Sequence, residues 1–141
     1  MRDFKSYFSE DYNFVFNKKT GFFARWGKTK EDNPPYSKIG PEILDIEVGT
    51  SCQGLGKSCP WCYKGNTPEG EYMSLETFKK ILHKFPRSLC QAALGIGDIS
   101  GNPDLFEIMD YCRNNEYNSI IPNITINGFN LKDEYAEKLV K

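Results

Sequence analysis

Three cysteines in one short stretch are the residues of this chain best suited to chemistry. Cys52, Cys59 and Cys62 stand in a C-x6-C-x2-C spacing on a loop that also carries several glycines. Thiolates grouped this closely bind a soft metal ion or an iron–sulfur cluster. Because no fourth ligand stands beside them, we expect a four-iron cluster held through three sulfurs, with one iron left open to a small molecule.

The other cysteines and the single histidine are candidates for a fourth ligand, and the pattern argues against each of them. His83 falls on the polar side of a predicted helix and is expected to be a solvated surface residue. Cys90 begins a predicted strand at the end far from the cysteine loop, and Cys112 lies on the apolar side of another predicted helix, so both are expected in the core. Two alternatives stay open: a zinc-binding structural or interaction module that uses the loop cysteines and a fourth ligand, and an iron–sulfur electron carrier.

A strand–loop–helix pattern, repeated three times, surrounds the cysteine loop and must position it. The predicted strands cover residues 44–48, 91–96 and 120–126, and the predicted helices cover residues 74–85, 103–112 and 133–141. Successive βα units predict a parallel sheet with right-handed crossovers. Ligands of such sheets lie at the carboxyl ends of the strands, so we expect the loops 49–66, 97–103 and 127–131 to converge on one site.

The chain before this pattern has a different character. In residues 12–26, aromatic and polar positions alternate on either side of a turn that ends in glycine, which predicts a β-hairpin. A polar, proline-containing connector follows at residues 28–41. The sequence therefore predicts an N-terminal extension over residues 1–41 and a βα core over residues 42–141, an α/β fold preceded by a small β-hairpin.

Composition narrows the class of protein. The chain has 141 residues, 39% of them hydrophobic, and a formal net charge of −1, so its charge gives no reason to expect a nucleic acid or an anionic membrane as a partner. Neither an apolar leader nor a membrane-length apolar run is visible. We therefore expect a cytoplasmic protein, where thiols stay reduced, and the odd count of five cysteines also argues against a disulfide framework.

The cysteine triad, followed by the aromatic residue Tyr63 and placed just after the first parallel strand, resembles the radical S-adenosylmethionine (radical SAM) superfamily. The usual spacing there is C-x3-C-x2-C with an aromatic residue before the last cysteine, which is Trp61 in this chain. This sequence has three extra residues between the first two cysteines, a departure that alters the shape of the loop.

Two later segments are similar to the same superfamily. The stretch Gly95-Ile96-Gly97-Asp98 stands where members carry a Gly-Gly-Glu motif that holds the amino group of the cofactor, with Asp98 in place of glutamate and Ile96 in place of glycine. It is followed by an Asn-Pro-Asp-Leu helix start at residues 102–105, and the third strand ends in Thr-Ile-Asn-Gly, which contains Asn127.

The resemblance implies the N-terminal half of a (β/α) partial TIM-like barrel that binds a [4Fe–4S] cluster and S-adenosyl-L-methionine. It implies Cys52, Cys59 and Cys62 as metal ligands and the following cofactor-binding residues: Tyr63, Gly95, Ile96, Gly97, Asp98 and Asn127. The implied reaction is reductive cleavage of S-adenosylmethionine to a 5′-deoxyadenosyl radical, which abstracts hydrogen from a substrate.

The resemblance also implies partners. An electron donor of the flavodoxin or ferredoxin type would reduce the cluster, and a second polypeptide or self-association would complete the barrel. The substrate is not specified by these residues, although a peptide or protein is a common class among members. Glu47 is the candidate for a catalytic, substrate-side role, because an ionised group facing the inside of a barrel is costly unless it has a partner or a function.

Overall fold

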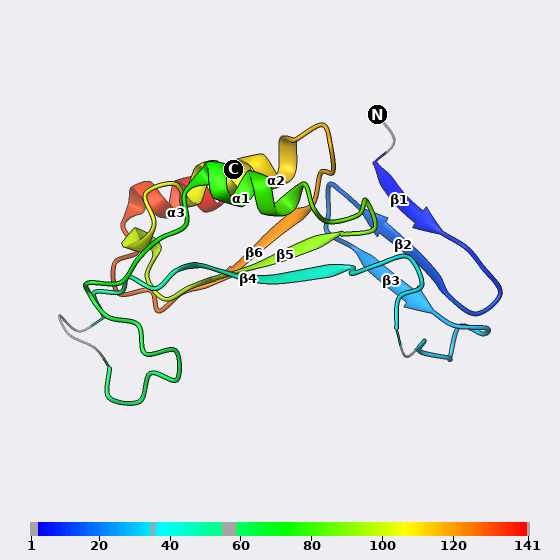
Figure 1. Cartoon of the computed structure of the whole chain (residues 1–141), viewed down its shortest axis with the longest axis horizontal. Helices are drawn as coiled ribbons and strands as arrows, with labels where there is room; N and C mark the ends of the chain where they lie inside the picture. The colour runs from blue at the N-terminus through cyan, green and yellow to red at the C-terminus, as the bar shows by residue number, and fades with distance from the viewer. Residues whose placement is uncertain (1–2, 35, 55–58, 141) are drawn as a thin grey trace.

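The computed structural model describes residues 3–34, 36–54 and 59–140. Within this part of the chain it contains two three-stranded sheets, one antiparallel and one parallel, and helices that pack on one side of the parallel sheet (Figure 1). The strands are β1 (Phe4–Tyr7), β2 (Asn13–Asn17), β3 (Phe23–Trp26), β4 (Ile43–Gly49), β5 (Gln91–Ile96) and β6 (Ile121–Thr125). The helices are α1 (Leu75–Leu82), the 3-10 turn η1 (Ile99–Gly101), α2 (Leu105–Asn114) and α3 (Asp133–Leu139).

The N-terminal sheet has the antiparallel order β1-β2-β3. The predicted hairpin is confirmed as β2 and β3, whose connecting turn is held by the side chain of Asn17. The extension is nevertheless larger than a hairpin, because β1 adds a third strand that the sequence did not predict. Its Lys5 points toward the rest of the protein, where its ammonium group donates to the carbonyl oxygen of Leu89 at 2.6 Å.

The second sheet has the parallel order β4-β5-β6, so the prediction of three parallel strands in an α/β fold is confirmed. Alternate residues of each strand face the helices, and those of β5 are buried: Ala92, Leu94 and Ile96. Parallel pairing of consecutive strands requires each connection to cross over one face of the sheet, and here α1 and α2 make the two crossovers.

Helix α1 begins where the sequence predicts, because the side chain of Ser74 caps the backbone N–H of Thr77. Its apolar side buries Phe78 and Leu82 against the parallel sheet. These two residues belong to one core with the following buried side chains: Val48, Leu89, Ala92, Leu94, Ile96, Ile99, Leu105, Ile108, Cys112 and Ile120. The expected core position of Cys112 is therefore confirmed.

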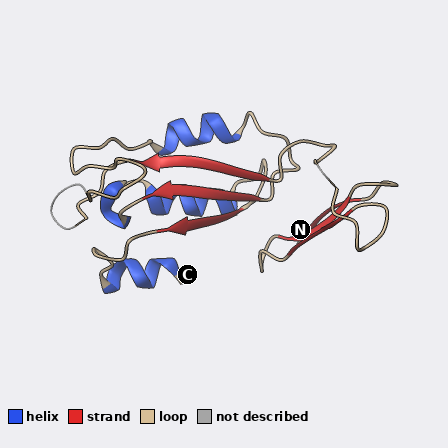
Figure 2. Ribbon diagram, turned by 90° about the horizontal axis from the view of Figure 1, so that it is seen from below, coloured by secondary structure: helices blue, strands red, loops and turns tan. Residues whose placement is uncertain are grey.

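Within the described part of the chain, no helix lies on the opposite face of the parallel sheet (Figures 1 and 2). Its edge strands present polar residues there, with Asp45 and Glu47 on β4 and Asn123 and Thr125 on β6, all exposed. Small residues of β5 lie between them. This face therefore carries polar side chains toward the loops at the carboxyl ends of the strands, whereas the apolar Ile43 is exposed at its amino end.

The N-terminal sheet packs at the amino ends of the parallel strands, far from the cysteine loop (Figure 1). Its aromatic residues Tyr12, Phe14 and Phe16 form a second buried cluster with Cys90, which confirms a core role for that cysteine. The Tyr12 hydroxyl donates to the Glu42 carboxylate, which also pairs with Arg25.

Burial shifts the ionisation of groups at this junction. It lowers the pKa of the Lys5 ammonium to about 8 and raises the pKa of the Cys90 thiol to about 12. It also raises the pKa of the Tyr12 hydroxyl to about 12, an effect that the hydrogen bond to Glu42 reinforces. Each shift reflects the cost of a charge held away from water.

Among the described helices, none has the length and apolar content that crossing a membrane requires.

Candidate functional site

The loops that follow the three parallel strands meet at one end of the sheet, as the sequence predicts (Figure 2). The backbone N–H of Asn127, after β6, donates to the carbonyl oxygen of Gly97, after β5, at 3.1 Å. The loop after β4 joins them through the backbone N–H of Gln53, which donates to the Asp98 carboxylate at 3.1 Å. Hydrogen bonds between all three loops thus define the candidate site.

Cys52 lies at the centre of this junction. Its backbone N–H donates to the carbonyl oxygen of Thr67 at 2.9 Å, and its Sγ lies 3.4 Å from Nδ2 of Asn127. Gly97 lies beneath the thiol, and a Cβ atom there would come within 3.4 Å of the sulfur and 2.8 Å of Nδ2 of Asn66. A side chain at this position would therefore require the Asn66 amide to move, so the glycine leaves room for the present packing of the cysteine loop on the end of β5.

The environment of Cys52 disfavours its thiolate in the absence of a metal. Burial is the largest cause and raises the pKa of this thiol, and the negative charge of Asp98 adds to the effect. A backbone N–H from Gly54 acts in the opposite direction without cancelling it. A cationic metal or cluster would reverse this balance, because a coordinating thiol gives up its proton.

Cys59 and Cys62 form a tight turn on the same loop. The backbone N–H of Cys62 donates to the carbonyl oxygen of Cys59 at 3.0 Å. Backbone N–H groups of Asn66 and Lys64 lower the pKa of the Cys62 thiol, and the Lys64 ammonium contributes further. The surroundings of the Cys62 thiol therefore favour its ionised, metal-binding form.

The chemistry of these donors suits a thiolate-bound metal group. Cys52, Cys59 and Cys62 are free and partly exposed. Over residues 3–34, 36–54 and 59–140, however, no three His, Cys, Asp or Glu side chains lie close enough together to hold a metal ion. Residues 55–58 of the loop lie outside the described part. Metal binding by the triad therefore stays a prediction, supported here by the type and exposure of the donors.

Asp98 is fully buried beside Cys52, at the start of η1. Burial acts to raise the pKa of its carboxyl group, but hydrogen bonds from Ser100, Asn130 and Gln53 outweigh it and hold that pKa below its ordinary value. The carboxylate is therefore ionised at neutral pH, and its charge is compensated by neutral donors. The contact of Asp98 with a cofactor stays a prediction.

An ion pair lies on the uncovered face of the sheet, next to the site. The Lys64 ammonium is 2.7 Å from Oε2 of Glu47, and the two side chains are 27% and 38% exposed. A Cβ atom on Gly95 would lie 2.8 Å from the Glu47 carboxylate and 3.0 Å from the ammonium, so the glycine makes room for the pair. The hydrogen bond that Lys64 donates to the Glu47 carboxylate raises the pKa of Lys64.

The remaining residues that the resemblance singled out differ in their surroundings. Tyr63 is 93% exposed at the edge of the site. The side chain of Ile96 is buried in the core on the helix side, so only its backbone faces the loops. Asn127 reaches Cys52 with its amide nitrogen, and its oxygen accepts from the backbone N–H of Phe129 at 3.0 Å.

Three residues of the site were not identified from the sequence: Lys64, Asn66 and Asn130. Lys64 directly follows the Cys-x2-Cys-Tyr segment, and this position was a usable signal for a role near the cysteines. The two asparagines carry no such signal, because asparagine is a common turn-forming residue and occurs in several other loops of this chain.

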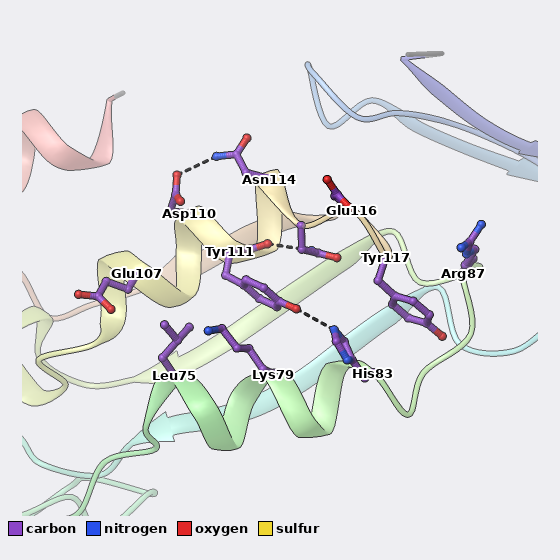
Figure 3. Close-up of a pocket in the computed structure, with 11 residues that line it drawn as sticks. Leu75, Lys79, His83, Arg87, Glu107, Asp110, Tyr111, Asn114, Glu116 and Tyr117 are labelled. Carbon is purple, nitrogen blue, oxygen red and sulfur yellow. Dashed lines mark hydrogen bonds between the residues drawn. The ribbon is translucent and has the colours of Figure 1, made fainter.

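A separate surface hollow lies elsewhere, between α1 and α2 (Figure 3). It has a volume of about 780 Å³ and is lined by charged and aromatic side chains, with His83 bonded to the Tyr111 hydroxyl at 2.7 Å. His83 is exposed, as predicted. None of the described residues that line this hollow belongs to the three converging loops, and we therefore place the candidate site at the cysteines.

Comparisons with protein-family models, with curated proteins and with solved structures return no match to this chain.

Proposed function

We propose that this chain is a radical SAM enzyme, or the cluster-bearing part of one, in which Cys52, Cys59 and Cys62 ligate a [4Fe–4S] cluster. One observation carries the proposal. Three loops from three parallel strands meet around Cys52, with Asn127 in contact with its sulfur. A cysteine at the carboxyl ends of parallel strands stands where α/β folds bind their ligands.

When bound, the cluster and S-adenosylmethionine supply a 5′-deoxyadenosyl radical for hydrogen abstraction from the substrate. The contribution of this chain is ligation, orientation and exclusion of water. Backbone N–H groups lower the pKa of the Cys62 thiol, and Gly97 leaves room for the Asn66 amide beside Cys52. The exposed ring of Tyr63 is available to the adenine, and the Glu47–Lys64 pair is available to orient a charged substrate.

The proposal extends to the fold. Strands β4, β5 and β6 would be the first three strands of a partial TIM-like barrel, with their uncovered polar face turned to its interior. Further strands beyond these three would complete the barrel. A cytoplasmic location and reduction by a flavodoxin or ferredoxin follow from the need of the cluster for a reducing environment.

Anaerobic reconstitution with iron and sulfide tests the proposal. The expected result is a brown protein whose visible absorbance is bleached by dithionite. Addition of S-adenosylmethionine should then change the electron paramagnetic resonance spectrum of the reduced protein and yield 5′-deoxyadenosine. Replacing Cys52, Cys59 or Cys62 by alanine should abolish the colour, whereas Cys112→Ala, which alters a buried thiol in the core, should retain it.

Two outcomes would overturn the proposal. A colourless protein that carries one zinc ion per chain and takes up no iron would indicate a zinc-binding module. A coloured protein that is bleached by dithionite but leaves its spectrum unchanged with S-adenosylmethionine would indicate an electron carrier.

A further inference from the structure

The carboxylate of Asp98 is completely occupied by groups of this chain. Its Oδ1 accepts from the backbone N–H of Ser100 at 3.0 Å and from the Ser100 hydroxyl at 2.9 Å. Its Oδ2 accepts from the backbone N–H of Gln53 at 3.1 Å and from Nδ2 of Asn130 at 2.6 Å. A carboxylate offers about four acceptor positions, so no position is left for an incoming ammonium group.

These four hydrogen bonds connect three separate loops. Ser100 belongs to η1 after β5, Gln53 belongs to the cysteine loop, and Asn130 belongs to the loop after β6. Asp98 itself is 0% exposed, so water cannot replace a donor that is removed. A buried charge is tolerated only while its donors are in place, and all three loops are therefore held in one arrangement.

Cys52 lies next to the hydrogen bond between Gln53 and Asp98. Gln53 directly follows Cys52, so the backbone is fixed on both sides of this cysteine, at the N–H of Cys52 by Thr67 and at the N–H of Gln53 by Asp98. The sulfur is thereby kept between Gly97 and Asn127. Loss of the Asp98 carboxylate would release one of the two anchors.

We infer that Asp98 is a positioning residue that fixes Cys52 through the backbone of Gln53, and that it is not a ligand of the cofactor's ammonium group. What Cys52 then binds rests on the function proposed above. The anchoring itself is a property of the chain without any metal, and it can be measured there.

Amide hydrogen exchange in the reduced, metal-free full chain is the direct test. Asp98→Asn keeps an oxygen for Ser100 but sets an amide nitrogen against the donors of Gln53 and Asn130. The informative group is the amide of Cys52, because its own acceptor, the carbonyl oxygen of Thr67, is untouched by the substitution. We expect this amide to exchange about tenfold faster in the variant.

Two further measurements make the result decisive. The Ile108 amide in α2 reports global opening and should exchange at an unchanged rate. If Asp98→Asn also accelerates Ile108, Asn130→Ala decides, because it removes one neutral donor and should still accelerate Cys52 about twofold to fivefold with Ile108 unchanged. Asn123→Ala, at an exposed asparagine outside the loops, should alter neither amide.

An unchanged exchange rate at Cys52 in Asp98→Asn overturns the inference. Where Asp98→Asn also accelerates Ile108, an unchanged rate at Cys52 in Asn130→Ala overturns it. Iron uptake separates it from the proposed function. If wild-type protein binds no iron but the exchange results are as expected, the proposed function fails and the anchoring by Asp98 stands. If wild-type protein binds iron and S-adenosylmethionine, Asp98→Asn should lower the iron content. A variant that keeps its iron but loses S-adenosylmethionine binding would instead restore the ligand role.

Discussion

Replacing Asn102 by alanine should lower the free energy of unfolding, because its side chain connects three backbone segments next to the site. Nδ2 of Asn102 donates to the carbonyl oxygens of Val48 at 2.8 Å and Met73 at 3.0 Å, and its Oδ1 accepts from the backbone N–H of Asp104 at 2.8 Å. The side chain thus ties the end of β4, the segment before α1 and the start of α2 together. At 3% exposure, water cannot take its place.

The magnitude follows from counting the groups left without a partner. The Val48 oxygen keeps a second donor, the backbone N–H of Met73 at 3.0 Å. The Met73 oxygen and the Asp104 N–H lose theirs, at a cost of about 1–3 kcal/mol each when buried. Because both residues are only half-buried, we expect the free energy of unfolding to fall by about 2–4 kcal/mol.

Urea denaturation followed by circular dichroism is the assay. Asn102→Asp should be at least as destabilising as Asn102→Ala, because a carboxylate oxygen would face the two carbonyl oxygens in place of the amide donor. Asn123→Ala, at an exposed position, should change the free energy by less than about 0.5 kcal/mol. A loss below about 1 kcal/mol in Asn102→Ala would refute the reasoning from unpaired groups.

Three other predictions concern the core, the N-terminal junction and the loop thiols. Phe78→Ala removes a fully buried side chain and should lower the free energy of unfolding by about 3–5 kcal/mol. The control Phe22→Ala, at a side chain that is 60% exposed, should change it by less than about 0.5 kcal/mol. Urea denaturation measures both values, and equal losses would contradict the assigned core. Because burial lowers the pKa of Lys5 from 10.5 to about 8, the unfolded chain binds this proton more tightly above pH 8, so Lys5 makes stability rise with pH. The buried thiols of Cys90 and Cys112, with pKa values raised from 9.0 to about 12, increasingly oppose this as the pH approaches 9 and passes it. The test is therefore the difference in the free energy of unfolding between wild type and Lys5→Met, which should shift in favour of wild type from about pH 8 to about pH 9. In reduced, metal-free protein at neutral pH, iodoacetamide should label Cys62, whose pKa is lowered, faster than Cys52, whose pKa is raised. Peptide mass spectrometry over time measures both labelling rates. Faster labelling of Cys52 would be incompatible with the described hydrogen bonds.

The elements of the parallel sheet could be predicted because their local and tertiary preferences agree. Ser74 is a good N-cap, so α1 begins at the expected residue. The apolar residues of α1 recur at helical spacing, so its apolar side packs on the sheet as expected. The alternation that ends in Leu94 and Ile96 describes a strand with one buried face, and β5 has the predicted bounds. Convergence of the loops then followed from topology alone.

Other features depend on contacts that no local pattern records. Strand β1 is short, and its Lys5 side chain points inward. There the ammonium group donates a hydrogen bond to the carbonyl oxygen of Leu89, which is distant in the sequence. The position of Asp98 just after β5, at the carboxyl end of the sheet, could be predicted from the strand pattern. Its surroundings were not foreseen, because Asn130, 32 residues away in the sequence, supplies the shortest of its hydrogen bonds.

The separation between sheltered and accessible sulfurs has a practical consequence for anyone handling this protein in air. Oxygen and peroxides will attack the accessible loop sulfurs first, while Cys90 and Cys112 stay shielded inside the packed interior. A spoiled sample can therefore melt at its usual temperature and give an unaltered circular dichroism spectrum. Counting titratable thiols, rather than confirming that the chain is folded, is the quality control that assays of this protein need.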